Sequence, residues 1–210
     1  MQHMNKKVII IGAGGHAKVI ADIVRKNNDI VVGFLDDAYD EKTEFYDSLI
    51  YGKISNYKEY ADCEFIIAIG NNPIREKISK KMCCEWYTAI HPSAQISDSV
   101  KIGKGSCVMA NAVINADTTI GSHAIINTGA IIEHDCKVGD FTHISPRATV
   151  CGLVSVGRGA WLGAGSVIKN VLNICENAIV GAGGVVISDI TEKGIYVGVP
   201  ARKNDNGRSK

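Results

Sequence analysis

The sequence lacks a segment that could cross a membrane or direct secretion. No apolar run approaches the roughly 20 residues that a transmembrane helix needs. The apolar stretch Val8–Ile11 is too short for the core of a signal peptide and runs into a glycine turn, so we interpret it as a buried strand. We treat Met1 to Met4 as a remnant of cloning, with Met4 as the native start. These features predict no membrane partner and a cytoplasmic location.

An excess of charge of one sign is also missing. The 23 basic and 22 acidic side chains are interspersed, and the formal net charge is +1. No basic stripe marks a nucleic-acid surface, and no polybasic cluster marks an anionic membrane. The composition therefore predicts no nucleic-acid partner.

Cysteines at metal-binding or redox spacing are absent. The chain has seven cysteines, an odd number, and none of them forms a C-x-x-C pair. In a chain of this length without a secretory signal, they are typical of reduced, structural thiols of a cytosolic protein. Because the ligand spacing does not favour zinc, we expect no metal.

The first part of the chain, residues 4–88, predicts a small Rossmann-like α/β domain. Apolar strands are expected at 7–11, 30–35 and 65–69, and helices at 16–26 and 73–82. Alternating strands and helices imply a parallel sheet with right-handed crossovers. The polar segment from Ala38 to Ala61 has no pattern that places it.

The second part, residues 89–202, has an aliphatic residue at every sixth position. A fixed six-residue period predicts a left-handed parallel β-helix of hexapeptide repeats. Glycine follows the aliphatic residue at intervals of three hexapeptides, which make one coil of a triangular prism, and small residues dominate four positions after it. We expect both positions to point inward at crowded corners. The aliphatic series is Ile90, Ile96, Ile102, Val108, Ile114, Ile120, Ile126, Ile132, Val138, Ile144, Val150, Val156, Leu162, Ile168, Ile174, Val180 and Val186.

This architecture has consequences for where a site can lie. Stacked coils bury apolar faces only against their neighbours, so both ends need caps, here the α/β domain and the tail 190–202. Flat outer faces offer no deep pocket within one prism. We therefore expect sites in clefts between subunits of a homotrimer.

Two histidines of the repeat are candidates for chemistry. His134 should point outward, and its neighbour Asp135 could hold the imidazole in one tautomer, as a general base requires. The alternative is a solvated surface histidine. His143 lies half a coil further along the chain, so the two rings should project from opposite sides of one prism and could meet across a trimer interface.

The turn Gly12–Ala17 follows a strand and begins a helix. It nearly fits the G-x-G-x-x-G/A fingerprint, and Asp36 and Asp37 stand about 20 residues on, where a ribose-binding acid is expected. Backbone N–H groups at the helix start favour phosphate. A nucleotide or its sugar is favoured over a dinucleotide, because about 85 residues make half of the fold that normally binds NAD.

Several motifs together resemble a known family. They are Ile-Ile-Gly-Ala-Gly-Gly-His-Ala-Lys-Val at 10–19, Phe-Leu-Asp-Asp at 34–37, Ala-Ile-Gly-Asn-Asn at 68–72, Asn-Thr-Gly-Ala-Ile-Ile-Glu-His-Asp-Cys at 127–136 and Gly-Val-Pro-Ala-Arg at 198–202. Nearly the whole chain resembles the bacterial sugar O-acyltransferases of the sialic acid O-acetyltransferase type. That group also includes N-acetyltransferases of nucleotide-linked 4-amino sugars.

The resemblance implies a role for each matching residue. His134 would be the general base and Asp135 its orienting carboxylate, although some relatives carry Glu where this chain has Asp135. Acetyl-CoA, a co-substrate and not a bound cofactor, would contact His143, Gly152, Ala164 and Ala182. The nucleotide part of the acceptor would lie at Gly14, Gly15, His16, Asp36 and Asp37, with Asn71 nearby.

The expected function is acetyl transfer from acetyl-CoA to a nucleotide-activated amino sugar in surface glycan biosynthesis. His134 would deprotonate the attacking amine, and the Gly152 N–H or His143 would stabilise the oxyanion. Three alternatives stay open: O-acetylation of sialic acid or a related sugar, a non-catalytic trimer that binds a nucleotide sugar, and an NAD-dependent enzyme. A serine acetyltransferase is disfavoured, because those enzymes normally carry a helical N-terminal domain.

Overall fold

The computed structural model describes residues 5–204, so the interpretation of Met1 to Met4 lies outside the described residues. The chain divides into two compact units, residues 1–92 and 93–210, which we describe separately. The roles assigned to 4–88 and 89–202 remain predictions. Within the described range, no helix is both long enough and apolar enough to cross a bilayer.

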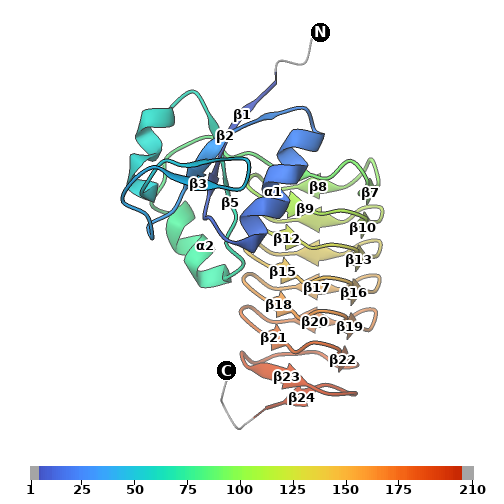
Figure 1. Cartoon of the computed structure of the whole chain (residues 1–210). Coiled ribbons are helices and arrows are strands. Elements are labelled where there is room, and N and C mark those ends of the chain that lie inside the picture. Colours follow the sequence, from blue (N-terminus) through green and yellow to red (C-terminus); the bar gives the residue numbers. More distant parts are fainter. Residues whose placement is uncertain (1–4, 205–210) are drawn as a thin grey trace. The chain divides into compact units, whose positions relative to one another are not determined.

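The first unit is a five-stranded sheet with the order β3-β4-β2-β1-β5 (Figure 1). Neighbouring strands are parallel except β3, which pairs antiparallel with β4. Its elements are β1 (Lys7–Ile11), α1 (Gly15–Lys26), β2 (Ile30–Leu35), β3 (Thr43–Phe45), β4 (Ser48–Ile50), the 3₁₀ helix η1 (Ile54–Tyr60), β5 (Glu64–Ile67), α2 (Asn72–Ser79) and β6 (Ala89–Ile90).

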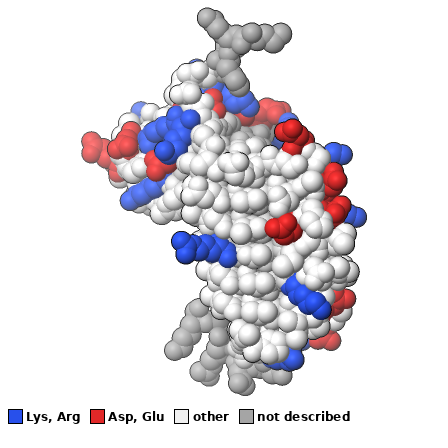
Figure 2. Space-filling view, turned by 90° about the vertical axis from the view of Figure 1, so that its right-hand side faces the viewer, with Lys and Arg blue, Asp and Glu red and all other residues white. Residues whose placement is uncertain are grey.

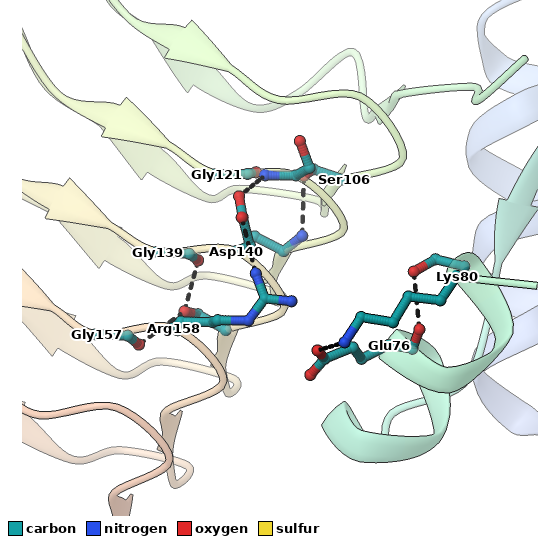
Figure 3. Close-up of polar contacts among 12 residues, drawn as sticks. Glu76, Lys80, Ser106, Gly121, Gly139, Asp140, Gly157 and Arg158 are labelled. Carbon is teal, nitrogen blue, oxygen red and sulfur yellow. Dashed lines mark hydrogen bonds and ion pairs between the residues drawn. The ribbon is translucent and has the colours of Figure 1, made fainter.

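Local sequence explains most of these elements. Val8 to Ile11 of β1 are fully buried, as expected for a central parallel strand. The helix α1 buries one face and carries Arg25 and Lys26 in its last turn, where they complement the helix dipole. On α2, Glu76 and Lys80 form an i,i+4 ion pair (Figure 3).

The structure also corrects two sequence expectations and shows the structure of the unplaced segment. The third predicted strand runs from Glu64 to Ile67 instead of 65–69, and α2 ends at Ser79 instead of residue 82. The unplaced segment Ala38–Ala61 holds the β3–β4 hairpin and η1. The hairpin extends the sheet on the side of β2, away from β5.

The topology of this sheet places a binding region at one edge. The chain runs from β1 to β2 on one side and later returns to β5 on the other side of β1. The carboxyl ends of these strands therefore adjoin a topological switch point, where ligands of open α/β sheets bind.

The second unit is a left-handed parallel β-helix whose two-residue strands form three flat sheets (Figure 1). Strands pair in parallel with the equivalent strand of the next coil, for example Ile131 with Thr149, except that β24 pairs antiparallel with β23. Sheet B contains β9 (Cys107–Val108), β12 (Ile125–Ile126), β15 (His143–Ile144), β18 (Trp161–Leu162), β21 (Ile179–Val180), β23 (Ile195–Val197) and β24 (Arg202–Lys203). Sheet C contains β7 (Gln95–Ile96), β10 (Val113–Ile114), β13 (Ile131–Ile132), β16 (Thr149–Val150), β19 (Val167–Ile168) and β22 (Val185–Val186). Sheet D contains β8 (Lys101–Ile102), β11 (Thr119–Ile120), β14 (Lys137–Val138), β17 (Ser155–Val156) and β20 (Asn173–Ile174).

The repeat positions fill the prism as the sequence predicts. From Val108 to Val186, every aliphatic residue of the series is at most 3% exposed. The small residues four positions later are fully buried, among them Ala112, Ala124, Ala130, Ala148, Ala160 and Ala178.

A further repeat position has a left-handed backbone, which the sequence analysis did not recognise. Three positions after each aliphatic residue, from Gly105 to Gly183, φ is positive. Glycine, Asn or Asp occupies most of these corners, since such residues tolerate this conformation. Leu153 and Val171 adopt it as well, with φ of 62° and 61°, although a bulky or β-branched residue rarely does.

We had expected the glycines that follow the aliphatic residues to point inward. They face the next coil instead. A Cβ at Gly139 would lie 2.6 Å from the backbone nitrogen of Arg158, and Gly103, Gly121 and Gly157 are equally close to the coil that follows each. Glycine is therefore needed here for the close approach of two backbones.

Most buried hydroxyl groups in the prism are hydrogen-bonded to the backbone. Ser106 Oγ donates to the Gly121 carbonyl at 2.8 Å and accepts from the Ala124 N–H at 2.9 Å (Figure 3). Ser166 is also fully buried, but its Oγ has no hydrogen-bond partner among residues 5–204. The two serines thus occupy equivalent repeat positions with opposite hydrogen-bonding states.

This contrast predicts opposite effects on stability. Ser166→Ala removes an unsatisfied buried hydroxyl and should leave the free energy of unfolding unchanged or raise it by up to about 1 kcal/mol. Ser106→Ala leaves a buried N–H and a buried carbonyl without their partner and should lower it by about 1–3 kcal/mol. Denaturant unfolding of both variants measures the difference, and equal destabilisation of the two would contradict the assignment.

Candidate active site

His134 and Asp135 form a pair at the corner that joins sheets C and D. They follow β13 after one intervening residue, Glu133, and His134 Nδ1 lies 2.8 Å from Asp135 Oδ2. Asp135 occupies the left-handed corner position, with φ of 59°. The two side chains are 56% and 49% exposed, so the imidazole is oriented by its neighbour and still open to solvent.

Gly152 lies one coil after His134 and leaves room for the imidazole. A Cβ on Gly152 would come within 2.8 Å of His134 Cε1 and Nε2, which shows that the ring rests against this residue. The N–H groups of Cys151 and Leu153 donate to Ile168 and to His134. The Gly152 N–H between them has no acceptor within the described part of the chain. An unused donor therefore adjoins the ring nitrogen that faces away from Asp135.

Cys136 follows this pair but points into the prism. Its thiol is fully buried and contacts the carbonyl groups of His134 and Cys151. Burial raises the pKa of the Cys136 thiol, which keeps it protonated and poorly nucleophilic.

His143 belongs to sheet B, opposite the corner that carries His134. Its Nε2 lies 3.1 Å from Asn127 Nδ2, and its ring stacks on Trp161 with centroids 5.6 Å apart. The sheet assignments put the two histidines on opposite sides of one prism. Within one chain the fold does not bring them together.

Ala164 and Ala182 lie at a third place, the corner that joins sheets B and C. They are exposed and occupy equivalent positions of successive coils, and the Gly183 N–H donates to the Ala164 carbonyl at 2.8 Å. Of the residues expected to contact acetyl-CoA, only Gly152 adjoins His134 in the same chain.

In the first unit, the glycine turn lies at the carboxyl end of β1. Gly14 is the N-cap of α1, and Gly15 and His16 are its first residues. A Cβ at Gly14 or Gly15 would meet no atom within 4 Å, so nothing in the chain requires these glycines. The open space lies where backbone N–H groups of a helix start can receive an anion.

The two acidic residues after β2, Asp36 and Asp37, differ in how their carboxylates are hydrogen-bonded. Asp36 accepts from the Ala13 N–H at 2.8 Å through Oδ2 and from the Ala38 N–H at 2.9 Å through Oδ1. Both carboxylate oxygens of Asp36 therefore accept hydrogen bonds from backbone N–H groups. Asp37 is exposed and accepts from the Ile54 N–H through Oδ1 alone.

Asn71 has a local role that the sequence analysis missed. Its side-chain oxygen accepts from the Ile74 N–H at 3.0 Å and caps the N-terminus of α2. The following Asn-Pro signals this cap in the sequence.

A hollow of about 650 Å³ lies beside Asp37, lined by η1 and α2. Its apolar lining includes Ile54, Tyr57 and Ile78, and Lys58 and Lys77 are among its charged residues. The sequence analysis missed this hollow because η1 lies in the segment that it could not place.

Comparisons with known proteins agree with this fold. Residues 7–82 match the model of the PglD N-terminal domain. The acetyltransferase domain of PglB from Neisseria gonorrhoeae is 31% identical, with 95% of this chain and 100% of that chain covered and a TM-score of 0.90. PerB from Caulobacter crescentus, solved with CoA and GDP-perosamine, is 38% identical, with 94% and 97% covered and a TM-score of 0.89.

The chain belongs to the hexapeptide-repeat sugar acyltransferase family. A curated relative, the UDP-N-acetylbacillosamine N-acetyltransferase of Bacillus subtilis, is 40% identical over 112 residues. That match covers 50% of this chain and 52% of the relative, so it spans about half the length of each.

The different bonding of Asp36 and Asp37 generates a prediction within this family. Asp36→Ala should lower the free energy of unfolding by about 1–3 kcal/mol, because two backbone N–H groups lose a charged acceptor. Asp37→Ala should affect stability less and weaken nucleotide binding more. Denaturant unfolding and calorimetric titration with UDP and GDP measure the two effects. A variant of Asp37 that binds nucleotides like the wild type would show that this acid does not face the ligand.

Proposed function

We propose that this protein is an acetyl-CoA-dependent N-acetyltransferase that acts on a nucleotide-activated amino sugar. The observation that carries the proposal is the His134–Asp135 pair, 2.8 Å apart, with its imidazole against Gly152. The neighbouring Gly152 N–H adds a donor for an oxyanion. The named activities of the Bacillus and Caulobacter relatives supply the class of acceptor.

The geometry supports direct transfer without an acyl-enzyme. Asp135 holds the imidazole proton on Nδ1, which leaves Nε2 of His134 as the base. The acceptor amine attacks the thioester carbonyl while Nε2 removes its proton. The Gly152 N–H stabilises the oxyanion of the tetrahedral intermediate. Collapse breaks the carbon–sulfur bond, and the proton on Nε2 passes to the CoA sulfur.

The first unit would hold the nucleotide of the acceptor. Gly14, Gly15 and His16 begin α1, where its N-terminal N–H groups favour a diphosphate. Asp37 is placed to bind ribose hydroxyls, and the adjoining hollow would take the base. We propose no direct contact between Asn71 and the nucleotide. Its role here is to cap and orient α2.

We also propose a homotrimer in which neighbouring prisms complete the site. The His134 side chain is 56% exposed at the corner of its own prism, which leaves it open to a neighbouring copy. His143, Ala164 and Ala182 would face acetyl-CoA from a neighbouring copy. Because acetyl-CoA is an intracellular metabolite, we place the enzyme in the cytoplasm, with a product destined for surface glycans.

The outward side chains of sheets C and D support this assembly. Sheet D presents the polar residues Lys101, Thr119, Lys137, Ser155 and Asn173, whereas sheet C presents Gln95, Val113, Ile131, Thr149, Val167 and Val185. Figure 2 looks at the side of sheet C and shows few charged side chains there. A broad uncharged face is typical of a surface that binds another protein copy.

This contrast predicts which substitutions break the assembly. Ile131→Lys and Val167→Lys place charges on sheet C and should shift the oligomer to monomers and abolish activity. Thr119→Lys is the control on sheet D and should leave the assembly unchanged. Light scattering after size-exclusion chromatography measures the mass. Trimers that withstand both sheet C substitutions would exclude this face as the interface.

The function is tested by CoA release from acetyl-CoA against UDP- and GDP-linked 4-amino sugars and free sialic acid. His134→Ala should lower turnover at least about a hundredfold with folding intact, because the general base is lost. Cys136→Ala is the matched control, and turnover should stay within about threefold because a buried, protonated thiol takes no part.

Each other outcome has a distinct meaning. Release with sialic acid alone would reassign the reaction to O-acetylation. No release with any acceptor from a folded oligomer, with nucleotide sugar still bound, would favour a non-catalytic binding protein. A Cys136 variant as inactive as the His134 variant would favour a covalent mechanism in which Cys136 carries the acyl group.

A further inference from the structure

The imidazole of His143 is held on three sides by residues of sheet B and the adjoining corner. Ile125, on the preceding coil, pairs with His143 in register and is 1% exposed. Trp161, on the following coil, pairs with His143 in register, and the two rings are parallel within 1°. Asn127 contacts the ring edge at Nε2. The ring is therefore placed between an aliphatic and an aromatic neighbour.

Trp161 is itself fixed to the coil that carries His143. Its indole N–H donates to Ser145 Oγ at 2.8 Å, and Ser145 is 5% exposed. Trp161 remains 41% exposed, although a large aromatic side chain normally gains by burial. The hydrogen bond and the stack keep the indole flat against the imidazole instead of letting it turn away.

The hydrogen bonds at the ring edge determine the tautomer of His143. The Thr128 N–H donates to Asn127 Oδ1 at 2.8 Å, which identifies that atom as the amide oxygen. The amide NH₂ of Asn127 therefore faces His143, and His143 Nε2 must accept from it. The proton of the neutral ring is then on Nδ1.

We propose that Trp161, fixed by Ser145, is a positioning residue that holds the ring plane and the Nδ1–H tautomer of His143. The inference rests on the proposed function, in which His143 faces acetyl-CoA from a neighbouring copy. Removing the indole frees the ring to rotate about its side-chain bonds, breaks its contact with Asn127 and admits the other tautomer. Small misplacement of such a group costs much activity, because the reacting atoms must be aligned.

Kinetics of five variants test the role. Trp161→Leu should lower kcat about tenfold and leave KM for acetyl-CoA within about twofold. Trp161→Phe keeps a stacked ring and should restore most of the activity, and Ser145→Ala should lie between wild type and Trp161→Leu. In a His143→Ala background, Trp161→Leu should have no further effect, because both changes act through one group.

Two kinetic results would overturn the proposal. Independent, multiplicative losses for Trp161→Leu and His143→Ala would show that Trp161 does not act through His143. A raised KM with unchanged kcat would show that the indole binds the donor directly.

An NMR measurement decides the matter without any turnover. In protein labelled with ¹⁵N-histidine, His143 should show the Nδ1–H pattern, assigned by its loss in the His143→Ala variant. Trp161→Leu should mix this pattern with that of the Nε2–H tautomer, whereas Trp161→Phe should preserve it. An unchanged pattern in Trp161→Leu would refute the positioning role. Failure of the proposed function would appear separately, as absent CoA release from the wild type.

Discussion

The structure of the second unit depends on the pairing of each residue with its equivalent one coil later. Parallel hydrogen bonds such as Thr119 N–H to the Cys136 carbonyl tie every coil to the next. Each side chain consequently has its closest neighbours at the same position of the coils before and after it. His134 rests on Gly152 and His143 stacks on Trp161 for this reason. A residue's chemistry in this unit is thus set as much by the adjacent coils as by its neighbours in the chain.

The same constraint explains what could be predicted from the sequence. Inward positions must be apolar or small. The six-residue period, the three sheets and the core from Val108 to Val186 could therefore be predicted from the sequence. The left-handed corner was not recognised, because five other residues interrupt its run of Gly, Asn and Asp: His123, Phe141, Arg147, Leu153 and Val171. The direction of glycines such as Gly139 was wrong, since spacing alone does not distinguish a crowded interior from a crowded neighbouring coil.

The candidate site was predictable to different depths in the two units. Adjacent residues such as His134 and Asp135 interact through local geometry, so their pairing followed from the sequence. The different bonding of Asp36 and Asp37 did not, because it depends on backbone N–H groups brought from Ala13 and Ile54 by the sheet. Gly14 and Gly15 matched a motif, but only the open space around them shows that the chain itself does not need glycine there.

A prism of this kind positions groups accurately but encloses nothing. His134 is 56% exposed and Trp161 is 41% exposed, so neither lies in a closed pocket of its own chain. In the proposed reaction, excluding water from the thioester would require a second surface, and a broad uncharged face is what such a surface needs to pack against. In the proposed trimer, the exposure of His134 and the composition of sheet C would therefore be connected, because a base on an open corner works efficiently only where another prism covers it.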